Sequence, residues 1–142
     1  MPSLDSLIPR FAAADKRTRL ETLLDYAKKL PPLAPDLVDA AEDERFRVTE
    51  CQTPVYLFIS VPEGKVKIQA AVPPESPTVR GFLSLLIRTL NDGPAEAVAA
   101  VPDDLLERLG LTEALGMNRT QGLTAILYRV KRGVATAAAG IV

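Results

Sequence analysis

Residues 55–72 read VYLFISVPEGKVKIQAAV, and this stretch sets the expected architecture of the chain. Apolar side chains recur at every second position before and after the Pro-Glu-Gly triplet at 62–64, which is the period of extended strands. Glycine permits the positive φ of a tight turn, so the stretch predicts an antiparallel hairpin of residues 55–61 and 65–72. A short strand over residues 45–48 is expected beside it, giving a three-stranded antiparallel meander with one solvated face.

The alternation also assigns the two faces of the hairpin. The core face is expected to hold Val55, Leu57, Ile59, Val61, Val66, Ile68, Ala70 and Val72. The opposite face is expected to hold Tyr56, Phe58 and Ser60 of one strand and Lys65, Lys67 and Gln69 of the other.

Helical periodicity surrounds the hairpin. It predicts helices over residues 4–14, 18–30, 79–90 and 120–138, with two shorter ones between the last pair. In the first helix Ser6 is the expected N-cap and Pro9 falls in the first turn, where its missing N–H costs nothing. In the last helix Arg129, Lys131 and Arg132 are expected to face water. The helices and the half-buried sheet cover one another, so we expect a single two-layer α+β domain over residues 1–142, with helices on one face of the sheet.

The composition excludes several classes of protein. Hydrophobic residues make up 47% and charged residues 25% of the 142, as in ordinary globular proteins. Seventeen basic residues balance 18 acidic ones without a basic stripe, so nucleic acid is not an expected partner. No apolar run approaches the roughly 20 residues that cross a bilayer, and no export signal is visible. One cysteine forms no internal disulfide, which favours a reducing cytoplasm.

The chemistry available to this chain is narrow. It has no histidine, so Ser-His-Asp and Cys-His pairs are excluded. Its eight glycines are scattered rather than gathered in a phosphate-binding loop, and one thiol without imidazole disfavours a zinc or iron–sulfur site within one chain. We therefore expect no cofactor.

The remaining candidate is Cys51, within residues 47–57, which read RVTECQTPVYL. The polar residues around it are typical of a loop, so the thiol is expected at the end of a strand. Arg47 and Arg119 are candidate cations that would favour its thiolate, and the alternative for each is a solvent-facing charge. Glu50 would act against the thiolate. Without a second cysteine, Cys51 is not a dithiol oxidoreductase, but it can accept a group from another protein and pass it on.

The same eleven residues resemble a known family pattern, Val-x-Gly-Cys-Gln-Ser-x-Val-Trp-Leu. It belongs to the SufE/CsdE family, the sulfur acceptors for cysteine desulfurases. Weaker similarities follow in matching order along nearly the whole chain: KKLPPL at 28–33, VRG at 79–81, LGL at 109–111 and NRTQGL at 118–123.

The resemblance implies a fold and a function. The fold is α+β, with helices beside a small antiparallel sheet, as in SufE and IscU. In the implied function, a pyridoxal-phosphate-dependent desulfurase of the SufS/CsdA type holds sulfur as a persulfide. Cys51 takes that sulfur, stimulates the desulfurase, and passes the sulfur to a scaffold that assembles iron–sulfur clusters. The chain itself is then an accessory protein rather than an enzyme.

This chain departs from the family pattern at three places. Glu50 replaces the usual glycine, Tyr56 replaces tryptophan, and Glu75 alone keeps a carboxylate in the segment that is usually Asp-Ser-Asp-Ala. The residues expected to bind a partner or to tune the thiol are Arg47, Glu50, Gln52, Tyr56, Glu75, Arg80 and Arg119.

Two other functions stay open at this point. In the first, the protein is a non-catalytic binding or regulatory module whose Cys51 is structural, because free cysteine is among the most buried residue types. In the second, Cys51 is a redox sensor, which nothing in the sequence favours.

Overall fold

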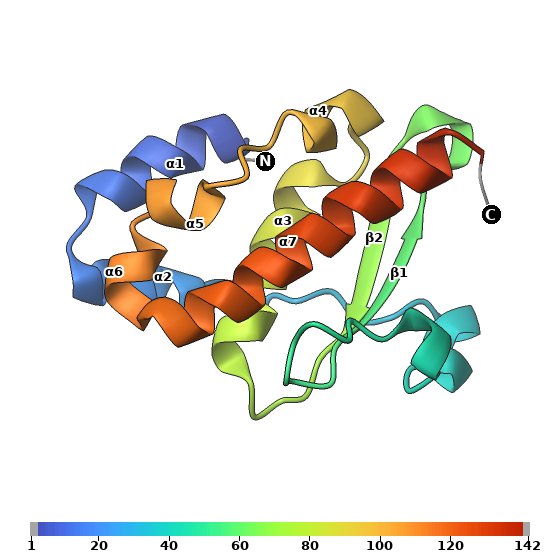
Figure 1. The fold of residues 1–142 in the computed structure, drawn as a ribbon, viewed down its shortest axis with the longest axis horizontal. Helices are drawn as coiled ribbons and strands as arrows, with labels where there is room; N and C mark the ends of the chain where they lie inside the picture. The colour runs from blue at the N-terminus through green and yellow to red at the C-terminus, as the bar shows by residue number, and fades with distance from the viewer. Residues whose placement is uncertain (1–2, 141–142) are drawn as a thin grey trace.

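The protein is described over residues 3–140 in a computed structural model, where helices pack around a two-stranded antiparallel sheet (Figure 1). Two helices precede the sheet, α1 (Leu4–Ala13) and α2 (Lys16–Lys28), and a connector with 3-10 turns at Pro35–Ala40 and Glu44–Phe46 leads into it. The strands are β1 (Tyr56–Ser60) and β2 (Lys67–Ala71). The helices that follow are α3 (Pro77–Leu90), α4 (Ala95–Ala99), α5 (Leu105–Arg108), α6 (Leu111–Leu115) and α7 (Met117–Ala138).

The hairpin predicted from residues 55–72 is confirmed. Leu57 pairs with Ala70 and Ile59 with Ile68, so these four side chains share the core face. The turn needs left-handed backbone, with φ of 54° at Glu63 and 80° at Gly64. Glycine adopts such a conformation without the steric cost that a Cβ brings.

The predicted third strand at residues 45–48 is wrong. Residues Glu44–Phe46 form a 3-10 turn instead, because the Asp43 carboxylate caps it by accepting from the Arg45 N–H at 3.0 Å. All that remains of sheet pairing here is one bridge between Arg47 and Tyr56. The α+β class holds, with two strands rather than three.

The outer face of the hairpin is also less solvated than expected. Tyr56 and Phe58 are buried, since the connector before β1 passes over them. The Phe46 ring lies 4.7 Å from the Phe58 ring, and the Gln69 side chain accepts from the Ala34 N–H at 2.7 Å. Contacts with the connector thus bury the outer face of the hairpin, which was predicted to be solvated.

The outer edge of β2 is covered by the segment after α3. The Asn91 side-chain amide makes two hydrogen bonds with the backbone of Ile68, accepting at 2.9 Å and donating at 3.0 Å. Next to it, the Val66 N–H donates to Gly93 at 2.8 Å and its carbonyl accepts from Asp92 at 2.9 Å. A short irregular segment therefore takes the place of a neighbouring strand.

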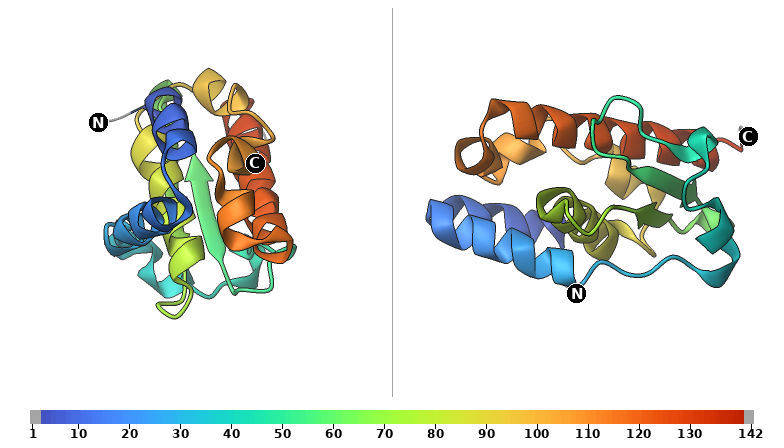
Figure 2. Two further views of the ribbon diagram at one scale, coloured as in Figure 1. Left: turned by 90° about the vertical axis from the view of Figure 1, so that its left-hand side faces the viewer. Right: turned by 90° about the horizontal axis from the view of Figure 1, so that it is seen from below.

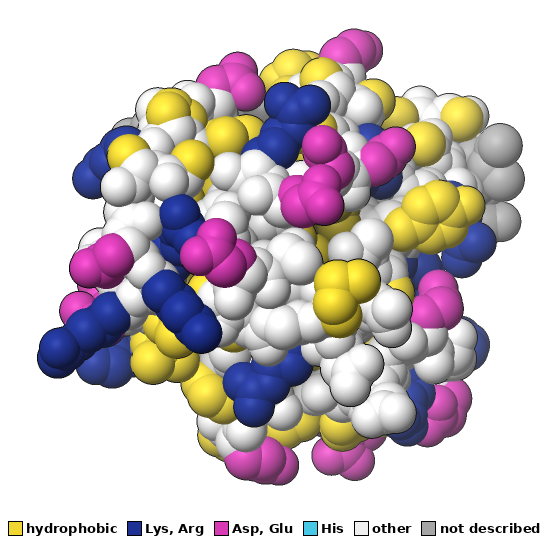
Figure 3. All heavy atoms as spheres, turned by 60° about the vertical axis from the view of Figure 1, so that its left-hand side comes forward, with side chains coloured by type: hydrophobic (Ala, Val, Ile, Leu, Met, Phe, Trp, Pro, Cys, Tyr) yellow, Lys and Arg dark blue, Asp and Glu magenta, His cyan; other side chains and the backbone are white. Residues whose placement is uncertain are grey.

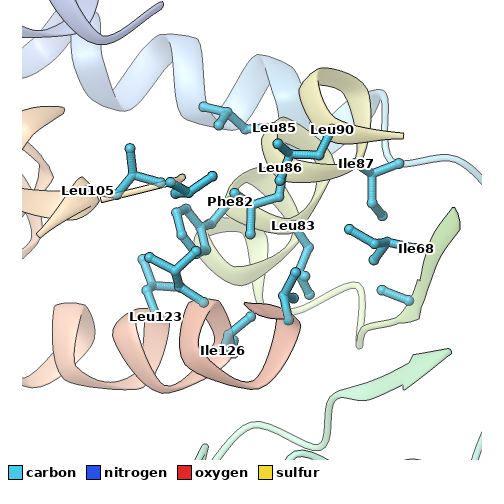
Figure 4. Packing of buried hydrophobic residues seen from close by; sticks show 14 of the residues in the cluster. Ile68, Phe82, Leu83, Leu85, Leu86, Ile87, Leu90, Leu105, Leu123 and Ile126 are labelled. Carbon is cyan, nitrogen blue, oxygen red and sulfur yellow. The ribbon is translucent and has the colours of Figure 1, made fainter. Parts of the chain in front are cut away.

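Helices α3 and α7 line the core face of the sheet (Figure 2). Figure 4 shows Phe82 and Leu83 of α3 directed toward Leu123 and Ile126 of α7, in a cluster that Ile68 of β2 joins. On its other side α3 lies against α2 so closely that a Cβ on Gly81 would come within 2.2 Å of the Leu23 carbonyl oxygen. Glycine at 81 is what permits this approach.

The N-terminal helix begins at Leu4 as predicted, but its N-cap is not the expected residue. Ser3, not Ser6, is the N-cap, and its hydroxyl oxygen accepts from the Ser6 N–H at 3.2 Å. Pro9 therefore lies inside α1 rather than in its first turn.

The surface carries mixed charge, in line with the nearly balanced composition. Figure 3 shows basic and acidic side chains interspersed on the face that carries α1 and α6. Among residues 3–140, no helix combines the length and the apolar character needed to cross a membrane.

Candidate functional site: a buried cysteine beside a pocket

Cys51 lies in the turn of residues 48–55, immediately before β1. At the base of this cysteine turn, the Val48 N–H donates to the Val55 carbonyl at 2.8 Å. Within it, the Cys51 N–H donates to the Val48 carbonyl at 3.3 Å. The predicted position of the thiol, in a loop at the end of a strand, is confirmed.

The thiol points inward rather than toward solvent. Cys51 is 6% exposed and belongs to the hydrophobic core cluster. Its Sγ faces Gly122 of α7, where an added Cβ would lie 3.8 Å from the sulfur. α7 therefore covers the sulfur on one side.

A pocket of about 740 Å³ adjoins the thiol. Three segments line it: the cysteine turn, the segment leading into α3, and the N-terminal part of α7. Figure 1 shows the first two side by side below the strands. Of the residues predicted to bind a partner or tune the thiol, this cysteine pocket collects Glu50, Gln52, Glu75 and Arg119 around Cys51.

The other three predicted residues lie outside the cysteine pocket. Arg47 pairs with Glu44 at 3.6 Å. Tyr56 is buried in β1, and the Arg80 guanidinium donates to the Val72 carbonyl at 2.8 Å. These contacts give Arg47, Tyr56 and Arg80 a role in the fold.

Glu50 fastens the cysteine turn to α7. Its carboxylate accepts from the Thr49 hydroxyl at 2.7 Å and lies 3.5 Å from the Arg129 guanidinium. The Thr49 hydrogen bond, followed by the backbone N–H of Glu50 itself and the positive charges of Arg129 and Arg132, lowers the pKa of Glu50 below its ordinary value. The group is therefore ionised at neutral pH.

Sequence reasoning missed Arg129, which was expected to face water. Its side chain is 25% exposed. A signal was present, because Arg129 follows Gly122 by two helical turns and so lies on the same face of α7. What the sequence could not show is that the cysteine turn packs on that face.

The arrangement suits one type of chemistry, the acceptance of a group by a thiol. A lone thiol lies under a short surface turn, next to a pocket that an exposed guanidinium, that of Arg119, also lines. Among residues 3–140, no three Cys, Asp or Glu side chains gather as ligands for a metal ion. The absence of a cofactor stays a prediction.

Comparison with known proteins identifies the family. The family model described as "Fe-S metabolism associated domain", SufE, matches residues 5–134. An uncharacterised SufE-like protein of Mycobacterium tuberculosis is 35% identical over 130 residues, which cover 91% of this chain and 89% of the relative. One from Synechocystis is 34% identical over 123 residues, covering 85% of this chain and 73% of the relative.

The fold agrees with a solved structure as well. The solution structure of a hypothetical protein from Thermus thermophilus superimposes with a TM-score of 0.81 at 38% identity, covering 96% of both chains. This chain belongs to the SufE family, and membership implies an accessory role in sulfur transfer, together with a cysteine desulfurase, for iron–sulfur metabolism.

Proposed function

We propose that this protein is a persulfide carrier that accepts sulfur on Cys51 from a cysteine desulfurase. The observation that supports this most directly is the position of the only thiol, which lines a pocket beneath a turn at the surface. The partner would be of the SufS/CsdA type and would itself carry the pyridoxal phosphate. The receiver would be a scaffold for iron–sulfur clusters, and the setting would be the cytoplasm.

The transfer is a thiol exchange at sulfur. The Cys51 thiolate attacks the outer sulfur of the desulfurase persulfide, and a new sulfur–sulfur bond forms on Cys51. The bond inside the donor persulfide breaks, and the desulfurase cysteine leaves as a thiolate. Electrons and atoms balance without an added oxidant. Cys51 becomes a persulfide, and the desulfurase is free for another cycle.

The cysteine turn must open for this attack, because Cys51 is 6% exposed. Opening removes a small side chain from the core, at a cost of about 1–2 kcal/mol by area. It also breaks the partly exposed Glu50–Arg129 pair, worth at most about 1 kcal/mol. Together these costs are at most about 3 kcal/mol, so at least roughly 0.6% of the molecules have the turn open, and a docking partner can select them. The Val48–Val55 hydrogen bond at the base of the turn need not break.

The other predicted residues of the cysteine pocket would either stabilise negative charge on the sulfur or contact the partner. Arg119 offers a cation to the thiolate and to the terminal sulfur of the persulfide. Gln52 is exposed on the turn and Glu75 on the facing segment, so both are placed to contact a docked desulfurase.

The burial of Cys51 is the one observation that favours a second function. In that reading the protein is a binding or regulatory module that stimulates the desulfurase by contact, and its cysteine is structural.

A single experiment separates the two functions. The protein is incubated with a SufS-type desulfurase and cysteine, and its intact mass and the rate of sulfide release are measured. We expect one added sulfur atom and faster turnover for the native chain, and neither for Cys51→Ser. Full stimulation by Cys51→Ser would overturn the carrier proposal and support the binding module.

A further inference from the structure

A second hollow lies between β1 and the C-terminal half of α7, with a volume of about 650 Å³. We call it the β1 groove. Leu57 and Ile59 of β1, Phe46 of the connector, and Gly133 and Ala137 of α7 give it an apolar lining. None of its lining residues belongs to the cysteine pocket. It is thus a separate site, and the proposed sulfur transfer does not involve it.

The strand edge beside this groove is unpaired. The Val55 carbonyl accepts from Val48, so alternation turns the backbone groups of Leu57 and Ile59 toward the same edge. Beyond the bridge between Arg47 and Tyr56, no segment of residues 3–140 pairs with β1 there. An extended chain laid along Ile59 would find hydrogen-bonding groups already aligned.

The groove is also positively charged. Arg45, Arg129 and Arg132 line it, and no carboxylate does so among the described residues. Arg45 already pairs with Asp43 at 2.6 Å and Arg129 with Glu50 at 3.5 Å, so Arg132 is the guanidinium most open to a further carboxylate. Arg132 makes no ion pair within residues 3–140 and lies over the Tyr128 ring at 5.8 Å. Guanidinium groups at the rim of an apolar groove are suited to carboxylates carried on an apolar body.

We propose that the β1 groove binds an extended segment of a partner protein in which apolar and acidic residues alternate, added as a third strand along β1. Alternation matches the geometry because side chains of one parity would enter the apolar lining. Those of the other parity would stay outside the apolar lining, where the long, exposed Arg132 side chain can pair with a carboxylate. The open strand edge favours a peptide over a fatty acid, since an acyl chain leaves backbone donors and acceptors unused.

The test uses the 142-residue chain alone, labelled with ¹⁵N, and a capped octapeptide of alternating valine and glutamate. We expect saturable shifts of the amide signals of residues 57–61 and slower hydrogen exchange at Ile59. A peptide with lysine in place of glutamate should bind at least about tenfold more weakly, because its cations meet the unpaired Arg132 guanidinium and offer it no carboxylate.

Two substitutions on α7 form a matched pair. Ala137→Glu places a carboxylate in the groove and should weaken binding of the acidic peptide by about tenfold or more. Ala135→Glu makes the same change at an exposed position outside the groove and should leave affinity within about twofold. Arg132→Gln removes the charge without adding bulk to the groove and should weaken binding by about three- to tenfold.

Several results would overturn the proposal. They are the absence of saturable binding at millimolar peptide, shifts confined to the cysteine pocket, and equal effects of the two glutamate substitutions. Stronger binding of decanoate than of the peptide would assign the groove to an acyl chain instead. Self-association with protection of the same amides would assign it to a second copy. Since no desulfurase is present, none of these outcomes depends on whether Cys51 carries sulfur.

Discussion

The Glu50 carboxylate lies 3.5 Å from the Arg129 guanidinium, and among residues 3–140 this is the only ion pair that joins the cysteine turn to another element. The family pattern has glycine where this chain has Glu50. A position that would make the turn flexible is here a tether to α7. The pair should therefore hold the turn closed over Cys51.

We predict that Arg129→Gln increases the rate at which iodoacetamide alkylates Cys51, by about two- to fivefold, because loss of a partly exposed pair costs up to about 1 kcal/mol. This variant separates two effects. If Arg129 acted only by attracting the thiolate, its removal would slow alkylation. Arg108→Gln, which breaks the Arg108–Asp104 pair elsewhere on the surface, is the control and should not change the rate. A slower or unchanged rate in Arg129→Gln would exclude the tether.

The lowered pKa of Glu50 predicts how the tether depends on pH. A carboxyl group whose pKa is lowered by folding stabilises the folded state above its unfolded pKa of about 4.3, and the contribution is lost as pH falls through the lower, folded value. We expect Glu50→Gln to lower the free energy of unfolding at pH 7 by a few tenths of a kcal/mol, because solvent screens the pair. Urea denaturation at pH 7 and pH 3 would check this. A difference that grows at pH 3 would contradict the assignment.

Gly122 controls where the sulfur lies. A Cβ at this position would meet Cys51 Sγ at 3.8 Å, an ordinary van der Waals distance. Gly122→Ala should therefore keep the thiol in place and stabilise α7 by up to about 1 kcal/mol. Gly122→Leu should displace the sulfur and speed alkylation by an order of magnitude or more. Equal alkylation rates in the two variants would show that α7 does not cover the thiol.

The contact between α2 and α3 predicts a severe effect at a small residue. Gly81→Ala puts a methyl group 2.2 Å from the Leu23 carbonyl oxygen, so the helices must separate, at a cost of about 3 kcal/mol. Ser84→Ala, on the same helix, removes a buried hydroxyl without a hydrogen-bond partner and should be neutral or stabilising by about 1 kcal/mol. Urea unfolding compares them. A mild Gly81→Ala combined with a damaging Ser84→Ala would refute this description of the interface.

Local patterns predicted much of the fold because local physics determines it. The alternation in residues 55–72 forms the observed hairpin, and the apolar stripes of α3 and α7 line the core. The strand expected at residues 45–48 failed because Asp43 caps a 3-10 turn there. The prediction of a solvated outer face failed for another reason. Phe46 contacts Phe58 only once the connector lies over the sheet, and the strand pattern does not reveal that contact.

The candidate site likewise has features that follow from local sequence and features that depend on contacts between distant segments. The loop position of Cys51 follows from neighbouring polar residues and Pro54, so it could be read from the sequence. The contact between Glu50 and Arg129 joins segments far apart in the chain, and neither segment reveals the other. Arg80 and Tyr56 show the limit of a resemblance, which marked them for docking: in the folded chain Arg80 bonds the Val72 carbonyl and Tyr56 is buried. Their part in docking stays a prediction.

The Asn91 amide, bonded to both backbone groups of Ile68, makes the sheet extendable from one side only. Association through strand addition at β1 should stop after a single event, since Val66 and Ile68 on the opposite margin already have hydrogen-bond partners. The protein can therefore leave one edge open without seeding fibres: two chains meeting there would close on each other as a dimer rather than begin a polymer.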